Sequence, residues 1–116
     1  MAITEAYSGT AAIGTTEYSA PNAANYDINT PITADGVYQV FLDVSDMVAG
    51  DQLQIRVYEK VRSADTQRVV YESVLSGAQA DIWVSPSLIL LHGWDVTLDT
   101  LAGTSITVNW SIRKVA

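Results

Sequence analysis

The chain has 116 residues, no cysteine and a single histidine, His92. Without cysteine it can form no disulfide, no thiolate metal site and no cysteine nucleophile. His92 stands between apolar neighbours, a context more typical of a hydrogen-bonded structural residue than of a metal ligand or general base. Neither the Gly-x-Ser-x-Gly arrangement of hydrolases nor a Gly-rich phosphate loop occurs in the sequence. We therefore expect no cofactor, no metal and no enzymatic activity.

Basic residues are scarce as well. Six Lys and Arg stand against thirteen Asp and Glu, which gives a formal net charge of −7. The basic residues form no stripe, and because phosphate contacts supply most nucleic-acid affinity, we expect no nucleic-acid partner. The longest apolar run, Leu88 to Leu91, is too short to cross a bilayer, and the start of the chain lacks the regions of a signal peptide. We expect a soluble protein without a membrane partner.

From residue 35 onward, apolar and polar residues alternate. A period of two places every second side chain on one side of a pleated strand. Short strands that follow one another roughly every ten residues are typical of a sandwich, a jelly roll or a small barrel. We therefore expect an all-β, antiparallel β-sandwich or jelly-roll-like domain over residues 35–116. Six strands are predicted, the fifth bent at Gly93: 37–44, 52–61, 66–75, 81–84, 88–99 and 105–115.

Residues 1–34 have a different composition. They are rich in Ala, Thr, Ser, Asn and Gly, and their Ile and Tyr residues stand at wide, irregular spacing. Such a segment buries too little apolar surface to fold by itself, and Pro21 and Pro31 disfavour a helix. We expect an extended N-terminal arm that lies along its own domain or a neighbour and that can add short strands.

Strand parity sorts the large aromatic residues. Trp94 and Trp110 are in phase with the aliphatic residues of their strands, so we expect them in the core. Three others share a face with polar residues: Phe41, Tyr58 and Trp83. They could be covered by the arm or by a second layer, form a protein interface, or stack on sugars. As partner-binding residues we expect these three and two from the arm: Ile3, Tyr7, Phe41, Tyr58 and Trp83.

One acidic loop could suggest calcium. Asp43, Ser45, Asp46 and Asp51 lie close together, but Met47 occupies a ligand position of the EF-hand pattern and no Glu ends the loop. Acidic residues are also typical of hairpin loops, because they hydrogen-bond to nearby backbone. We expect turn chemistry rather than a metal site here.

A family resemblance rests on six short segments. In order they read DGVYQVFLD (35–43), GD (50–51), RVYEKV (56–61), IWVSP (82–86), LHGWDVTL (91–98) and WSIRK (110–114). In these segments the chain resembles small virion-associated proteins of tailed bacteriophages, and it is similar in size and character to capsid decoration, or cement, proteins. The resemblance covers residues 35–116 and carries no catalytic residue.

What the resemblance implies is a structural protein on the outer surface of the phage capsid, made in the cytoplasm of the host bacterium. Its partners would be the major capsid protein and copies of itself, as a homo-oligomer on the particle. Two alternatives stay open: another virion component at the head–tail connector, tail or fibre, and a carbohydrate-binding module for host attachment. A glycan array separates the last alternative from the others.

Overall fold

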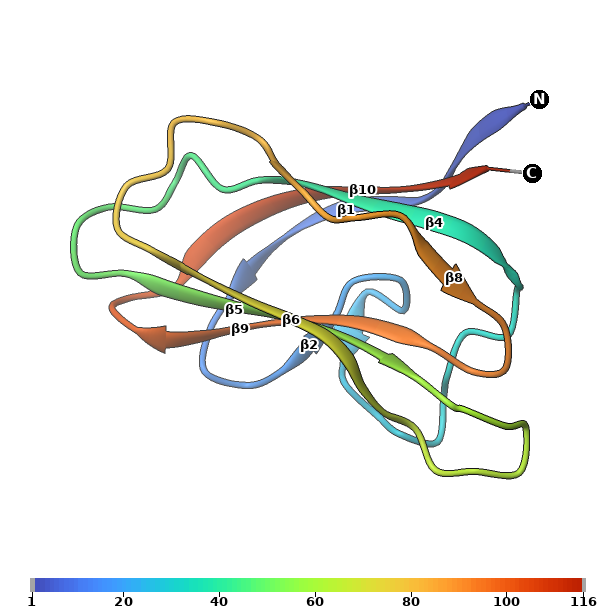
Figure 1. Cartoon of the computed structure of the whole chain (residues 1–116). Helices are drawn as coiled ribbons and strands as arrows, with labels where there is room; N and C mark the ends of the chain where they lie inside the picture. The colour runs from blue at the N-terminus through green and yellow to red at the C-terminus, as the bar shows by residue number, and fades with distance from the viewer. Residues whose placement is uncertain (1, 116) are drawn as a thin grey trace.

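The structure, a computed structural model, describes residues 2–115 and consists of two antiparallel sheets (Figure 1). In sheet A the order is β1 (Ile3–Ile13), β10 (Ile106–Val115) and β4 (Gly36–Asp43), and β4 pairs with both β7 (Trp83–Val84) and β8 (Leu88–Leu90). In sheet B the order is β3 (Ala24–Asn25), β2 (Tyr18–Ser19), β9 (Asp95–Ala102), β5 (Gln52–Glu59) and β6 (Arg68–Ser76). The expected all-β antiparallel fold is confirmed.

Strand pairing is nested along the chain. The first strand, β1, pairs with the last, β10, and β2 pairs with β9. Further in, β4 pairs with β7 and β8, and β5 pairs with β6. The chain is therefore one long antiparallel hairpin whose successive segments alternate between the two sheets (Figure 1). The pairs β10–β4 and β9–β5 join these units side by side.

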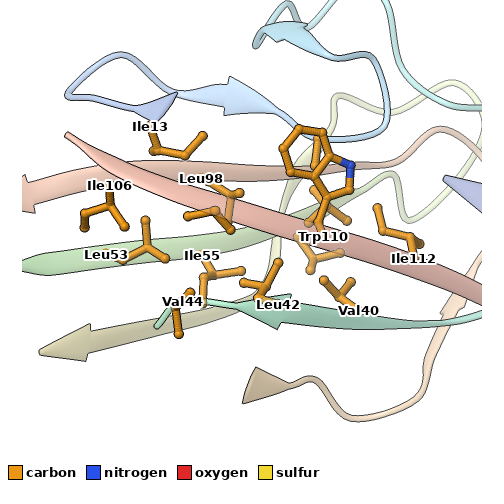
Figure 2. Packing of buried hydrophobic residues seen from close by; sticks show 14 of the residues in the cluster. Ile13, Val40, Leu42, Val44, Leu53, Ile55, Leu98, Ile106, Trp110 and Ile112 are labelled. Carbon is orange, nitrogen blue, oxygen red and sulfur yellow. The ribbon is translucent and has the colours of Figure 1, made fainter. Parts of the chain in front are cut away.

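The alternation in the sequence builds the core. Apolar side chains of both sheets point into the space between them, as Figure 2 shows for Leu42 and Trp110 of sheet A and Ile55 and Leu98 of sheet B. Each fully buried aliphatic side chain contributes roughly 1.5–3 kcal/mol. The expected core positions of Trp94 and Trp110 are confirmed, at 0% and 4% exposed.

Residues 2–34 supply strands to both sheets, β1 to sheet A and β2 and β3 to sheet B. β1 pairs with β10 along its whole length, and Ile13 is fully buried. Its inward positions keep the period of two, with Tyr7 and Ala11 packed against the core. Gly9 stands between them and pairs with Trp110. Because Gly9 has no apolar side chain, the alternation of β1 was not visible in the sequence. The expected boundary at residue 34 separates neither sheet from the other, because each sheet contains strands from both sides of it.

One predicted strand is wrong. The segment 88–99 is not a single bent strand, because β8 belongs to sheet A and β9 to sheet B. The residues between them cross from one sheet to the other, and the Glu59 carboxylate accepts hydrogen bonds from the backbone N–H groups of Leu91 and Gly93. Apolar residues stand on both sides of this crossing, so periodicity alone could not reveal it.

Candidate functional site

The five residues expected to bind a partner do not share one surface. Two of them lie on β1. Ile3 is 68% exposed, whereas Tyr7 is half-buried and meets Trp94 edge-on, with ring centroids 5.9 Å apart. Only Ile3 of this pair presents most of its surface to solvent.

Phe41 lies on the outer face of sheet A, since its neighbours Val40 and Leu42 point into the core. The Arg113 guanidinium carbon stands 3.9 Å from the centre of the Phe41 ring. This cation–π contact shields one face of the ring. Phe41 is therefore on an outward face, as expected, but is partly buried.

Trp83 faces inward, contrary to its expected outward parity. It pairs with the buried Leu42, packs against the core, and lies near Tyr71, with ring centroids 6.4 Å apart. Its neighbours Ile82 and Val84 are the exposed residues. The two-residue strand β7 has apolar side chains on both faces, so parity with aliphatic neighbours was no guide to its orientation.

Tyr58 lies on the outer face of sheet B and is nevertheless 9% exposed. The ring of Tyr26 stacks on it, with centroids 4.7 Å apart and an interplanar angle of 15°. The Tyr26 hydroxyl donates a hydrogen bond to Gln67, which fixes the covering ring in place. The N-terminal segment therefore covers Tyr58, in line with one of the three interpretations open from the sequence.

A polar network surrounds this aromatic pair. The Glu17 carboxylate accepts hydrogen bonds from the hydroxyls of Tyr58, at 2.6 Å, and of Thr97. Arg56 lies 3.9 Å from the same carboxylate and pairs more closely with Glu72, at 2.8 Å. Burial, and then the hydrogen bond to Glu17, raise the pKa of Tyr58 to about 12. Tyr58 therefore remains a hydrogen-bond donor across the physiological pH range.

Asp95 is the buried carboxylate of this face. Its Oδ1 accepts hydrogen bonds from the Ser19 hydroxyl, at 2.6 Å, and from the Val96 amide, at 2.8 Å. Its Oδ2 has no partner among residues 2–115. Burial raises the pKa of Asp95 to about 6, although both hydrogen bonds act in the opposite direction. Ser19 and Asp95 are both 0% exposed, and their hydrogen bond joins β2 to β9.

The acidic loop between β4 and β5 uses its carboxylates on backbone. Asp43 accepts hydrogen bonds from the amide and hydroxyl of Ser45, and Asp51 accepts one from the Val48 amide. Asp46 accepts one from a backbone amide of β10. Within residues 2–115, no group of three or more His, Asp or Glu side chains is placed to hold a metal ion. These contacts agree with the turn chemistry expected for the loop.

The densest group of exposed apolar side chains lies around the predicted residue Trp83 but contains none of the five residues expected to bind a partner. Seven of the twelve large hydrophobic residues that are exposed in the described chain fall within residues 69–91, on and around the edge strands β6, β7 and β8. The contact between Tyr71 and Trp83 shows that these two sheet edges are neighbours. We call this surface the apolar edge, and its members are Val69, Val70, Val74, Ile82, Val84, Ile89 and Leu91. The sequence feature that could have indicated this surface is that residues 69–91 have apolar side chains at both inward and outward strand positions.

Comparison of the chain with family models, with curated proteins and with solved structures found no match. In the part of the chain that the structure describes, no helix is long and apolar enough to span a membrane.

Proposed function

We propose that this protein is a structural component of a tailed-bacteriophage virion, a decoration protein that binds and stabilises the outer surface of the head shell. The observation that supports the proposal is the apolar edge. Soluble monomers rarely expose large contiguous apolar patches, and such patches mark interaction sites. In this chain the exposed apolar residues follow the neighbouring edge strands of the two sheets, Val74 on the outer face of sheet B and Ile89 on that of sheet A.

The chemistry of the apolar edge suits a contact made by side chains. Ile89 is 82% exposed and Val74 is 45% exposed, so a shell protein that covers them removes apolar area from water. The neighbouring charges are few, and two of them, Arg56 and Glu72, already pair with each other. Binding through this edge should therefore be insensitive to moderate salt, because screening weakens charge contacts and not apolar burial.

The nested strand pairing supports the proposal at the level of fold. We propose that the sandwich is a jelly roll, a double-sheet architecture found in viral capsid domains and also in lectins. The carbohydrate-binding alternative needs an accessible aromatic ring face. Here Tyr26 covers Tyr58, Arg113 covers one face of Phe41, and Trp83 turns toward the core. The placement of the aromatic residues therefore favours a protein partner over a sugar.

The test uses phage heads assembled without this protein. Such heads should form but release their DNA on heating at a lower temperature, and adding the purified protein should restore the temperature. The variant that combines Val74→Glu with Ile89→Glu places a charge on each side of the apolar edge and should fail to bind. Val61→Glu is the matched control, since Val61 is 81% exposed in the loop between β5 and β6. This variant should bind and restore the heads like the unmodified protein.

Two results would contradict the decoration role. In one, heads without the protein are as heat-resistant as complete heads but no longer adsorb to host cells, which would favour the attachment module. In the other, the Val74→Glu, Ile89→Glu variant binds heads as tightly as the Val61→Glu control, which would remove the apolar edge from the contact.

A further inference from the structure

Three of the four sheet edges carry features that hinder the addition of another strand. Edge strands are commonly protected by shortness, bulges, charges or proline. β6 is bulged at Val70 and carries Arg68 and Glu72. The edge formed by β7 and β8 is interrupted around Pro86, and β2 and β3 have two residues each.

The fourth edge, β1, lacks this protection over most of its length. It has eleven residues, most of them exposed, and within residues 2–115 it pairs along its length with β10 alone. Its one bulge lies between Glu5 and Tyr7, and Glu5 is its only charged residue. From Tyr7 to Ile13 the pairing with β10 is regular, so every second residue directs its N–H and C=O to the free side.

Charge indicates what can approach this edge. The chain has a net charge of −7, which makes close contact between two copies unfavourable at most surfaces. Residues 6–16 carry no charge at all, so two copies can meet at β1 without opposing like charges. Antiparallel pairing of a segment with itself places this uncharged stretch opposite its own copy, around a two-fold axis.

We propose that β1 pairs with β1 of a second copy, so that sheet A of one protomer continues into sheet A of the other in a two-fold dimer. Pairing over residues 7–13 keeps both faces in register. Thr10 then faces Thr10 of the second copy on the outer face and Ser8 lies opposite the second copy's Ala12, while Tyr7 and Ala11 lose their remaining exposure on the inner face. The dimer goes beyond the shell-binding role and does not depend on it.

Sedimentation equilibrium on the full chain tests the proposal. The unmodified protein should show a monomer–dimer equilibrium. The variant that combines Ser8→Glu with Thr10→Glu brings like charges together in an antiparallel pairing and should raise the dissociation constant roughly tenfold or more. Both residues are exposed on the outer face, so the fold should survive, and circular dichroism checks this. Ser8→Lys with Thr10→Lys should dissociate in the same way, and mixing the Glu and Lys variants should restore a dimer.

Two readouts separate this dimer from other contacts. Val74→Glu with Ile89→Glu is the control, because it alters the apolar edge and should leave the dimer intact. In the unmodified protein, amide hydrogen exchange of residues 7–13 should slow as protein concentration rises, and this measurement needs no variant.

A protein that stays monomeric at the highest concentration overturns the proposal. So does a dimer that survives the Glu pair on β1, or one that dissociates only when the apolar edge is changed. A protein that forms the dimer but does not bind the shell contradicts the shell-binding role alone. A protein that binds the shell but stays monomeric contradicts the dimer alone.

Discussion

Replacing Asp95 by Asn should remove the part of the pH dependence of the unfolding free energy that comes from the titration of this carboxyl group. The folded protein raises the pKa of Asp95 from an ordinary 3.8 to about 6, chiefly because the side chain is buried. The folded state therefore binds this proton more tightly than the unfolded state. The resulting stabilisation is complete below the unfolded pKa, is lost as the pH rises toward about 6, and is constant above that.

The magnitude follows from the shift. At about 1.4 kcal/mol per pKa unit, a shift of about two units corresponds to about 3 kcal/mol between the two limits of pH. Asn retains an oxygen that accepts from Ser19 and Val96, but its NH2 group takes the place of the partnerless Oδ2. An unsatisfied buried donor costs about 1–3 kcal/mol at every pH. The decisive quantity is therefore how the difference between the two proteins changes with pH.

Urea unfolding of both proteins at pH 4 and pH 7.5 measures this change. Wild type should lose about 2–3 kcal/mol relative to Asp95→Asn as the pH rises across this interval. In Ser19→Ala, which lacks a hydrogen bond that lowers the pKa of Asp95, the same loss should have its midpoint at a higher pH. A difference between wild type and Asp95→Asn that is equal at both pH values would refute the reasoning.

Three further predictions concern packing. Trp94→Ala and Trp110→Ala should each destabilise the protein by about 3–5 kcal/mol, and Trp83→Ala by clearly less, which thermal unfolding can compare; equal losses would refute the burial assignment. Gly9→Ala should cost about 1–3 kcal/mol in urea unfolding, because a Cβ there would lie 2.7 Å from the Trp110 ring; an unchanged midpoint would show that the ring yields. Deleting residues 1–30 removes β1, β2 and β3, so circular dichroism should show loss of folding. A folded remainder would instead support an N-terminal arm that is separate from the domain.

The sequence was a reliable guide wherever one face of a strand is apolar and the other polar. Tyr38, Val40 and Leu42 alternate with Gln39 and Phe41, and β4 begins and ends within one residue of its predicted bounds. β10 follows the same rule. In these strands local patterning and global packing agree, so a period of two suffices to locate the strand and its inward face.

The features that were missed depend on contacts between residues far apart in the chain. Tyr26 covers Tyr58 across 32 positions, and Ser19 reaches Asp95 across 76. No short window of sequence contains both partners of either contact, so the coverage of Tyr58 was only one of three alternatives and the raised pKa of Asp95 was not predicted. The crossing between β8 and β9 was missed for a different reason, since its residues are apolar on both sides of the break.

The apolar edge was missed because strand parity was applied to edge strands. In a central strand an apolar residue at the outward parity is unusual, whereas an edge strand can carry apolar side chains on both faces. Val74 is outward in β6 and Leu75 is inward, and both are apolar. Sequence alone cannot say which strands are at the edges, so it could not locate this surface.

The copy number of the chain per purified phage particle tests the central claim most directly. Quantitative mass spectrometry against the major capsid protein gives the ratio. The decoration role predicts a fixed ratio set by the symmetry of the whole shell, saturating when purified protein is added back to stripped heads. A ratio that corresponds to a single vertex, connector or tail assembly would contradict it.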